Sequence, residues 1–265
     1  MNSNKYLEVN KDLWNGKTDI HIKSNYYDMD GFKAGKTSLN PIELEALGDV
    51  KGKSILHLQC HFGLDSLSLA RLEAKVTAID FSDRSIEFAK NLNQELGLDV
   101  KFICTDIYSL PNILEHKFDI VFTSYGTIVW LPDLDKWASV ISKYLKPNGE
   151  FFIVDGHPFA GMYDKNFEKI IYSYFNLGPD IEEIKGTYAD KSADFVHLSY
   201  QWSHSMSEII MSLIKYKLQI VSFMEFPFIY KNSFKSSIEE KNGHWMIKGL
   251  ENKIPLLFSI KARKL

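Results

Sequence analysis

The chain has 265 residues, of which 45% are apolar, and its formal net charge is -3. The charges are spread along the whole length and form no basic stripe that could neutralise phosphates, which argues against nucleic acid as a partner. Charged residues also interrupt every apolar run well short of the ~20 residues that cross a bilayer, so we expect no membrane span.

The N-terminal residues 1–10 are polar and lack the apolar core of a secretory signal, so we expect a cytoplasmic protein. Its two cysteines are too few for a disulfide framework or a zinc cage, and we predict no metal site. No linker divides the chain. We therefore predict a single domain over 1–265, with 1–50 as an N-terminal helical cap.

From residue 54 to 155, β-branched runs alternate with segments of helical period, which is typical of a parallel sheet in an α/β fold. Beyond residue 157 this regularity lapses, and the aromatic-rich segment 157–203, together with 229–250, is interpreted as an inserted lid over the substrate. The predicted strands are 54–58, 75–79, 100–104, 118–123, 150–154, 218–226 and 255–260, and the predicted helices are 64–72, 82–95, 133–145 and 205–216.

Two carboxylates stand at the ends of successive strands, where an open parallel sheet binds its ligands. Asp80 follows Gly63 by 17 residues and can accept hydrogen bonds from both ribose hydroxyls of an adenosine. Asp106 can accept from an adenine amino group, with Phe81 and Ile107 against the faces of the ring. The alternatives are a charge at a helix N-terminus for Asp80 and a turn residue for Asp106.

The loop after the first strand argues against a dinucleotide. A pyrophosphate needs glycines that let backbone amides approach closely, yet Gln59 and His61 occupy two of those positions and only Gly63 remains. A ligand without phosphates tolerates these side chains, because the loop then holds only a sugar and an amino-acid tail.

These motifs together resemble the class I S-adenosylmethionine-dependent methyltransferases, over residues 35–155 and again over 205–265. Ile-Leu-His-Leu-Gln-Cys-His-Phe-Gly63 stands in place of their Gly-rich loop. Ala78-Ile-Asp80-Phe-Ser82 is similar to their ribose motif, Cys104-Thr-Asp106-Ile107 to their adenine motif, and Leu145-Lys-Pro-Asn-Gly-Glu150 to their turn into the fifth strand.

The resemblance implies a doubly wound, mostly parallel, seven-stranded Rossmann-like sheet and methyl transfer from S-adenosyl-L-methionine to a small molecule, with S-adenosyl-L-homocysteine as product. We expect a monomer or a homodimer. The expected cofactor-binding residues are His57, Gln59, Cys60, His61, Gly63, Asp80, Phe81, Ser82, Thr105, Asp106, Ile107, Ser124 and Tyr125. Because the family commonly has an acidic residue at position 57 and glycines at 59 and 61, the methionine tail is expected to be held differently here.

The sulfonium is an activated methyl donor, so the protein mainly has to orient a nucleophile in line with the methyl–sulfur bond. An oxygen or protonated nitrogen nucleophile also needs a proton acceptor. His157 follows the fifth strand directly and is the candidate base or substrate contact, with Tyr125, at the fourth strand end, as a second catalytic candidate. The alternative for His157 is a hydrogen-bonding turn residue.

Two other functions remain open from the sequence. The first is a nucleotide-dependent oxidoreductase, which the composition of the first loop disfavours. The second is a non-catalytic module that binds S-adenosylmethionine without transferring its methyl group.

Overall fold

A computed structural model describes residues 5–265 and has a seven-stranded sheet of order β3-β2-β1-β4-β5-β11-β8, in which the alternating pattern of residues 54–155 supplies β1 to β5. Strands β1 to β5 are parallel, and β11 runs antiparallel to both of its neighbours, β5 and β8. The strands are β1 (Ser54–His57), β2 (Lys75–Asp80), β3 (Lys101–Cys104), β4 (Phe118–Ser124), β5 (Leu145–Gly156), β8 (Leu218–Phe226) and β11 (Leu257–Lys264). The expected doubly wound, mostly parallel sheet is confirmed.

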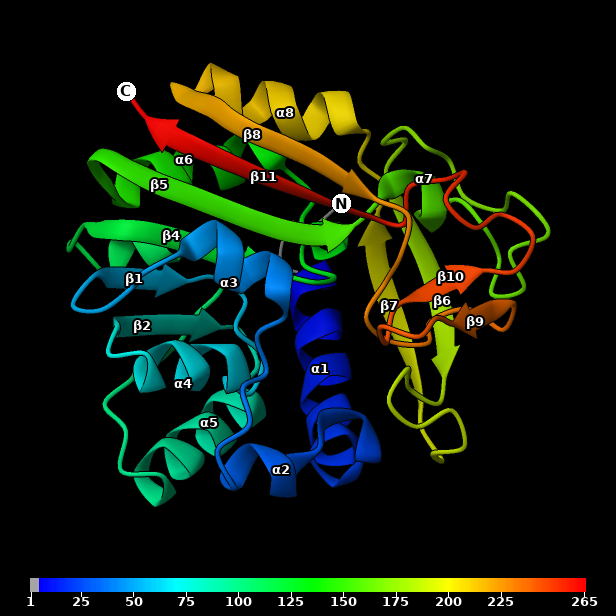
Figure 1. The fold of residues 1–265 in the computed structure, drawn as a ribbon, viewed down its shortest axis with the longest axis horizontal. Coiled ribbons are helices and arrows are strands. Elements are labelled where there is room, and N and C mark those ends of the chain that lie inside the picture. The colour runs from blue at the N-terminus through cyan, green and yellow to red at the C-terminus, as the bar shows by residue number, and fades with distance from the viewer. Residues whose placement is uncertain (1–4) are drawn as a thin grey trace.

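Helices cover both faces of the sheet. Successive side chains of a strand point to opposite faces and therefore join different hydrophobic clusters. Ile55 and Phe152 join a hydrophobic cluster with α4 and α5, whereas their neighbours Leu56 and Phe151 join one with α6 and α8. The helices are α3 (Pro41–Leu47), α4 (Leu64–Arg71), α5 (Asp83–Glu95), α6 (Leu134–Tyr144) and α8 (Met206–Lys215). Figure 1 shows these helices on the two sides of the sheet.

The fifth strand begins earlier than predicted, at Leu145 instead of residue 150. Phe118 pairs with Leu145 and Ile120 with Glu150, so the register shifts between them and the turn Lys146–Gly149 is carried as an irregularity within the strand. Short 3-10 helices lie at η2 (Leu110–Asn112) and η3 (Ile128–Trp130). Over residues 5–265, no helix has the length and apolar character to cross a membrane.

The N-terminal segment contains α1 (Lys5–Lys23), η1 (Asn25–Tyr27) and α2 (Met29–Lys33); the first four residues of the predicted cap lie outside the described residues. Figure 1 shows α1 between the carboxyl ends of the parallel strands and a hairpin of β6 (Pro179–Lys185) and β7 (Val196–Trp202). The Asn10 amide is paired with the backbone of Tyr200, at 2.8 and 2.9 Å. Helix α1 therefore joins this hairpin to the sheet.

The remaining inserted elements gather at the ends of β5, β8 and β11. They are α7 (Pro158–Gly161), β9 (Ser237–Glu239) and β10 (Trp245–Ile247). Ala160, Phe167, Ile229, Ile247 and Leu256 form a third hydrophobic cluster there, separate from the two that cover the sheet. The segments interpreted from the sequence as a lid thus contain two separate hairpins, one against α1 and one with this third cluster.

Candidate functional site

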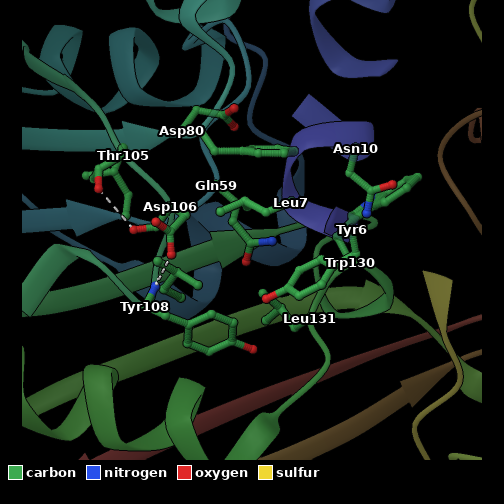
Figure 2. Close-up of a pocket in the computed structure, with 13 residues that line it drawn as sticks. Tyr6, Leu7, Asn10, Gln59, Asp80, Thr105, Asp106, Tyr108, Trp130 and Leu131 are labelled. Carbon is green, nitrogen blue, oxygen red and sulfur yellow. Dashed lines mark hydrogen bonds between the residues drawn. The ribbon is translucent and has the colours of Figure 1, made fainter. Parts of the chain in front are cut away.

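A cavity opens at the carboxyl ends of β1, β2 and β3, beside the point where the strand order reverses between β1 and β4. It has about 450 Å³ of empty volume, part of it open to solvent. Figure 2 shows side chains from three strand ends, from α1 and from the loop after β4 facing one another across it. Its lining residues are Tyr6, Leu7, Asn10, Gln59, Ile79, Asp80, Phe81, Thr105, Asp106, Ile107, Tyr108, Trp130 and Leu131.

Asp80 lies in the wall of the cavity with only 7% of its surface exposed. Its Oδ2 accepts from the His61 amide at 2.8 Å, and its Oδ1 accepts from the Ser82 amide at 2.9 Å. Ser82, not Asp80, is the side chain that caps α5. Burial raises the pKa of Asp80 to about 7 despite these two amides. The carboxyl is thus held in a fixed position and keeps acceptor capacity, since each oxygen has a second lone pair.

Asp106 is a turn residue, which was one of the two roles considered from the sequence, and it also lines the cavity. Its Oδ1 accepts from the amides of Tyr108 and Ser109 at 2.9 and 3.0 Å, so the side chain stabilises the turn after β3. It also lines the cavity together with Asp80, and Phe81 and Ile107 supply apolar surface to the same wall. The two carboxylates at adjacent strand ends therefore share one cavity.

In the loop after β1, two residues with side chains adopt the left-handed backbone conformation that glycine usually adopts. Gln59 and His61 both have φ of 52°, and Gly63 has φ of 86°. Left-handed conformations of this kind are strained for residues with a side chain. Gly63 also has no room for one, because an added Cβ would lie 2.7 Å from the ring of Phe102.

The side chain of Gln59 indicates whether an adenosine ligand with amino groups fits this cavity. Its Nε2 donates to the Thr127 carbonyl at 3.0 Å, which fixes the amide, while its buried Oε1 has no partner among residues 5–265. An unpaired buried acceptor is costly unless a ligand supplies the donor. The carboxylates, the apolar wall and this free acceptor fit the hydroxyls, ring and amino groups of S-adenosylmethionine.

Several predicted cofactor-binding residues support the cavity from behind without lining it. His57 is buried, its Nδ1 lies 2.7 Å from the Ser66 hydroxyl, and burial lowers its pKa to about 3. The Cys60 amide donates to the Ile79 carbonyl at 2.8 Å, which ties the loop to β2. The predicted residues outside the lining are His57, Cys60, His61, Gly63, Ser82, Ser124 and Tyr125.

Ser124 and Tyr125 connect the end of β4 to buried acids. The Tyr125 hydroxyl donates to Glu43 Oε2 at 2.8 Å, and burial raises the pKa of Glu43 to about 7. Ser124 donates to Asp65 Oδ2 at 2.9 Å, and burial raises the pKa of that carboxyl too. This group holds α3 and the start of α4 against the strand end.

His157 lies at the end of β5, among β8 and β11 and away from the residues that line the cavity. Its Nδ1 accepts from the Phe159 amide at 3.1 Å, which caps α7, and its Nε2 lies 2.8 Å from Glu225 Oε1. Burial lowers the pKa of His157, and Glu225 partly opposes this shift. Both ring nitrogens therefore already face groups of the chain.

Helix α1 and the loop after β4 contribute residues to the cavity that were not predicted from the sequence. Tyr6, Leu7 and Asn10 line the cavity although this segment reads only as a polar terminus. Trp130 follows β4 in a loop that Asp155 organises, since its carboxylate accepts from the amides and hydroxyl of Thr127 and its neighbours. Trp130 was the residue in the sequence from which a role of this loop in the cavity could have been predicted.

Comparisons with known proteins agree with this geometry. A family described as "Methyltransferase domain" matches residues 49–178. A ubiquinone biosynthesis O-methyltransferase from Coxiella burnetii (strain Dugway 5J108-111) is 30% identical over 178 residues, which are 63% of this chain and 69% of the relative. The corresponding enzyme from Xanthomonas euvesicatoria pv. vesicatoria (strain 85-10) is 30% identical over 135 residues, 50% of this chain and 56% of the relative.

Solved structures share the fold at lower identity. An S-adenosylmethionine dependent methyltransferase from Mesorhizobium loti has a TM-score of 0.59 at 18% identity, covering 88% of this chain and all, 100%, of the other. One from Clostridium acetobutylicum has a TM-score of 0.57 at 16% identity, covering 92% and 94%.

Proposed function

Because the chain belongs to the S-adenosylmethionine-dependent methyltransferases, we propose that it methylates an oxygen atom of its small-molecule acceptor. The choice of oxygen is supported by the O-methyltransferases to which the chain is similar. The oxidoreductase and the non-catalytic module are not favoured by these relatives. We further propose a cytoplasmic protein that acts as a monomer or a homodimer.

The observation that carries the site assignment is the shared cavity of Asp80 and Asp106. In this proposal Asp80 accepts from the ribose hydroxyls, Asp106 and Gln59 accept from amino groups, and Phe81 and Ile107 pack against the adenine. Bound S-adenosylmethionine supplies a methyl group already activated by the sulfonium. The chain itself orients the acceptor and excludes water, which accounts for most of what such a displacement requires.

The catalytic roles of Tyr125 and His157 stay predictions. The Tyr125 hydroxyl is held by Glu43 and by the Asn40 amide at 3.1 Å, which suits a fixed contact to a ligand at the end of β4. Because Nδ1 accepts from Phe159, the neutral ring carries its proton on Nε2 beside Glu225, so His157 can take a proton only if its contact with Phe159 opens.

The site assignment is tested by Asp80→Asn, which removes the charge and leaves one amide oxygen, so that only one of the His61 and Ser82 amides keeps its acceptor. At pH 8 we expect S-adenosylhomocysteine to bind more than tenfold more weakly, because a charge-assisted hydrogen bond contributes about 1.5–3 kcal/mol. Isothermal titration calorimetry measures this directly.

The pKa of Asp80, raised to about 7, gives this experiment a second readout. Only the ionised carboxylate accepts strongly, so the affinity of the wild type should fall as the pH drops below 7, while that of Asp80→Asn stays flat. Asp83→Asn, an exposed change three residues away, is the matched control. Equal affinity of Asp80→Asn and wild type at pH 8 would remove Asp80 from the site.

A further inference from the structure

Lys17 is a buried lysine without a counter-ion. Only 4% of its surface is exposed, and no carboxylate lies within ion-pair distance of it among residues 5–265. Its ammonium instead faces aromatic rings, 4.6 Å from the centroid of Trp14, 5.2 Å from that of Trp130 and 5.9 Å from that of Tyr188. Burial lowers the pKa of Lys17 to about 8.

Two histidines next to Lys17 also lack partners. His21 is fully buried, and neither of its ring nitrogens has a hydrogen-bond partner within the described part of the chain. The same holds for the Nε2 of His61, whose ring centroid lies 5.3 Å from that of His21. Burial and the nearby Lys17 lower the pKa of both imidazoles. We call Lys17, His21 and His61, with the rings of Trp14, Trp130, Tyr27 and Tyr188, the basic aromatic cluster.

The basic aromatic cluster adjoins the cofactor cavity. Trp130 belongs to both, since it lines the cavity and faces the Lys17 ammonium. His61 links the two sites without lining the cavity, because its amide donates to Asp80 in the cavity wall while its ring packs edge-on against Trp14 at 5.1 Å. A molecule bound in the cluster would therefore lie next to the cofactor.

The outer wall of the cluster is a side chain of the β6–β7 hairpin. Tyr188 covers His21 at a centroid distance of 4.5 Å, and its hydroxyl is hydrogen-bonded to that of Tyr27. Tyr188 is itself 43% exposed, so it separates the cluster from solvent as a single layer. Moving this side chain outward would open the cluster without disturbing the sheet.

The arrangement has the chemistry of an anion site. A buried ammonium without a partner is unfavourable, because it has lost its hydration and gained no opposite charge. Among the described residues, Lys17, His21 and His61 can each donate to an anion, and the rings of Trp14, Trp130, Tyr27 and Tyr188 pack beside them. An aromatic molecule with a negative charge would satisfy both the donors and the rings.

We propose that the basic aromatic cluster binds the methyl acceptor, and that this acceptor is a small aromatic molecule bearing an anionic oxygen, as a carboxylate or an ionised hydroxyl. The inference rests on the proposed function, since it supplies the acceptor for the same reaction. Lys17 and His21 hold the anionic oxygen, and Tyr188 closes over the ring.

Calorimetry on the protein saturated with S-adenosylhomocysteine tests the proposal with two anions, benzoate and 4-nitrophenolate, and their uncharged analogues, benzamide and 4-nitroanisole. We expect at least one anion to bind, each neutral analogue to bind at least tenfold more weakly, and Lys17→Met to remove the preference for charge. Binding of benzoate points to a carboxylate, and binding of 4-nitrophenolate to an ionised hydroxyl. Lys23→Met, at an exposed position of the same helix, is the matched control and should behave as wild type.

Thermal unfolding shows whether Lys17 has only a structural role. Without ligand, Lys17→Met should raise the Tm, because it removes an unpaired buried charge; a lower Tm would mark Lys17 as a structural residue and count against the proposal. Absence of binding by both anions, or equal binding by Lys17→Met and wild type, would overturn it.

The cofactor itself carries a carboxylate. A further comparison distinguishes a contact of Lys17 with this carboxylate from a contact of Lys17 with the acceptor. S-adenosylhomocysteine and 5'-methylthioadenosine, which lacks the amino-acid tail, should each bind Lys17→Met as they bind wild type. Weaker binding of S-adenosylhomocysteine alone would assign Lys17 to the cofactor and overturn the inference. Failure of wild type to bind S-adenosylhomocysteine would instead contradict the proposed function, and the anion preference would then be measured on the apoprotein.

Discussion

Gln59 and His61 illustrate how far single residues could be interpreted from the sequence. The missing glycines correctly argued against a pyrophosphate, but a sequence does not reveal φ, so the left-handed backbone at both positions could not be foreseen. At these positions Gln59 lines the cavity with a buried Oε1 that has no partner among residues 5–265, and the ring of His61 packs against His21 and Trp14. Asp80 and Asp106 were easier to identify because strand ends converge in any parallel sheet.

His157 permits a test that separates helix capping from proton transfer. His157→Ala removes the acceptor for the Phe159 amide and should cost about 1 kcal/mol of stability, the usual effect of losing an N-cap. His157→Asn retains a capping oxygen and should recover that stability in urea unfolding.

Turnover is the second measurement on these His157 variants. If the imidazole accepts the proton, kcat with the best acceptor should fall in both variants while the affinity for S-adenosylhomocysteine is unchanged. Wild-type kcat in His157→Asn would leave His157 as a helix cap and nothing more.

At the scale of elements, the sheet and its helices were predictable and the N-terminal segment was expected to be helical, but the place of α1 at the cavity was not predicted. Apolar runs located the strands within a few residues, because the central strands bury both faces, as β1 and β4 do. Helix α1 contacts both α5 and β7, so it lacks the single apolar stripe that marks a surface helix. Its place over the cavity depends on partners about 190 residues away in sequence, which no local pattern encodes.

Asn10→Ala should loosen the β6–β7 hairpin from α1. The substitution leaves the amide and carbonyl of Tyr200 without partners, at a cost of about 1–3 kcal/mol for a buried group. We expect faster tryptic cleavage at Lys185 and Lys191, measured by limited proteolysis under native conditions.

Asn93→Ala is the control for this change, because Asn93 makes the same double contact to the backbone of Val100, far from the hairpin. It should lower global stability without a selective gain in cleavage at the two lysines. Indistinguishable cleavage patterns in the two variants would show that Asn10 does not hold the hairpin.

The molecule as a whole buries both acids and bases near its site, so its stability depends on pH through several groups. Glu43 is fully buried, and its pKa is raised to about 7 in the folded protein from 4.5. Between these two values the unfolded chain loses the proton first. Stability is therefore lost as the pH rises through this range, and the loss is complete above pH 7.

Glu43→Gln removes this titration while keeping an acceptor for Tyr125. The variant should gain stability relative to wild type as the pH rises from about 4.5 to 7, by up to roughly 3 kcal/mol, with no further gain above pH 7. Urea unfolding across this range measures the difference. Glu45→Gln, exposed on the same helix, should show no such trend, and a pH-independent difference for Glu43→Gln would refute the assignment.

The bond between Asn10 and Tyr200 has a consequence for biosynthesis. Helix α1 is synthesised before the five parallel strands, whereas its partner strand β7 is synthesised only after them. Until β7 has been synthesised, the side chain of Asn10 lacks its hydrogen-bond partner in Tyr200. The part of the cavity wall that α1 supplies is therefore fixed late. A nascent chain that stalls before residue 196 would contain β1 to β5 but not β7, the strand that pairs with α1.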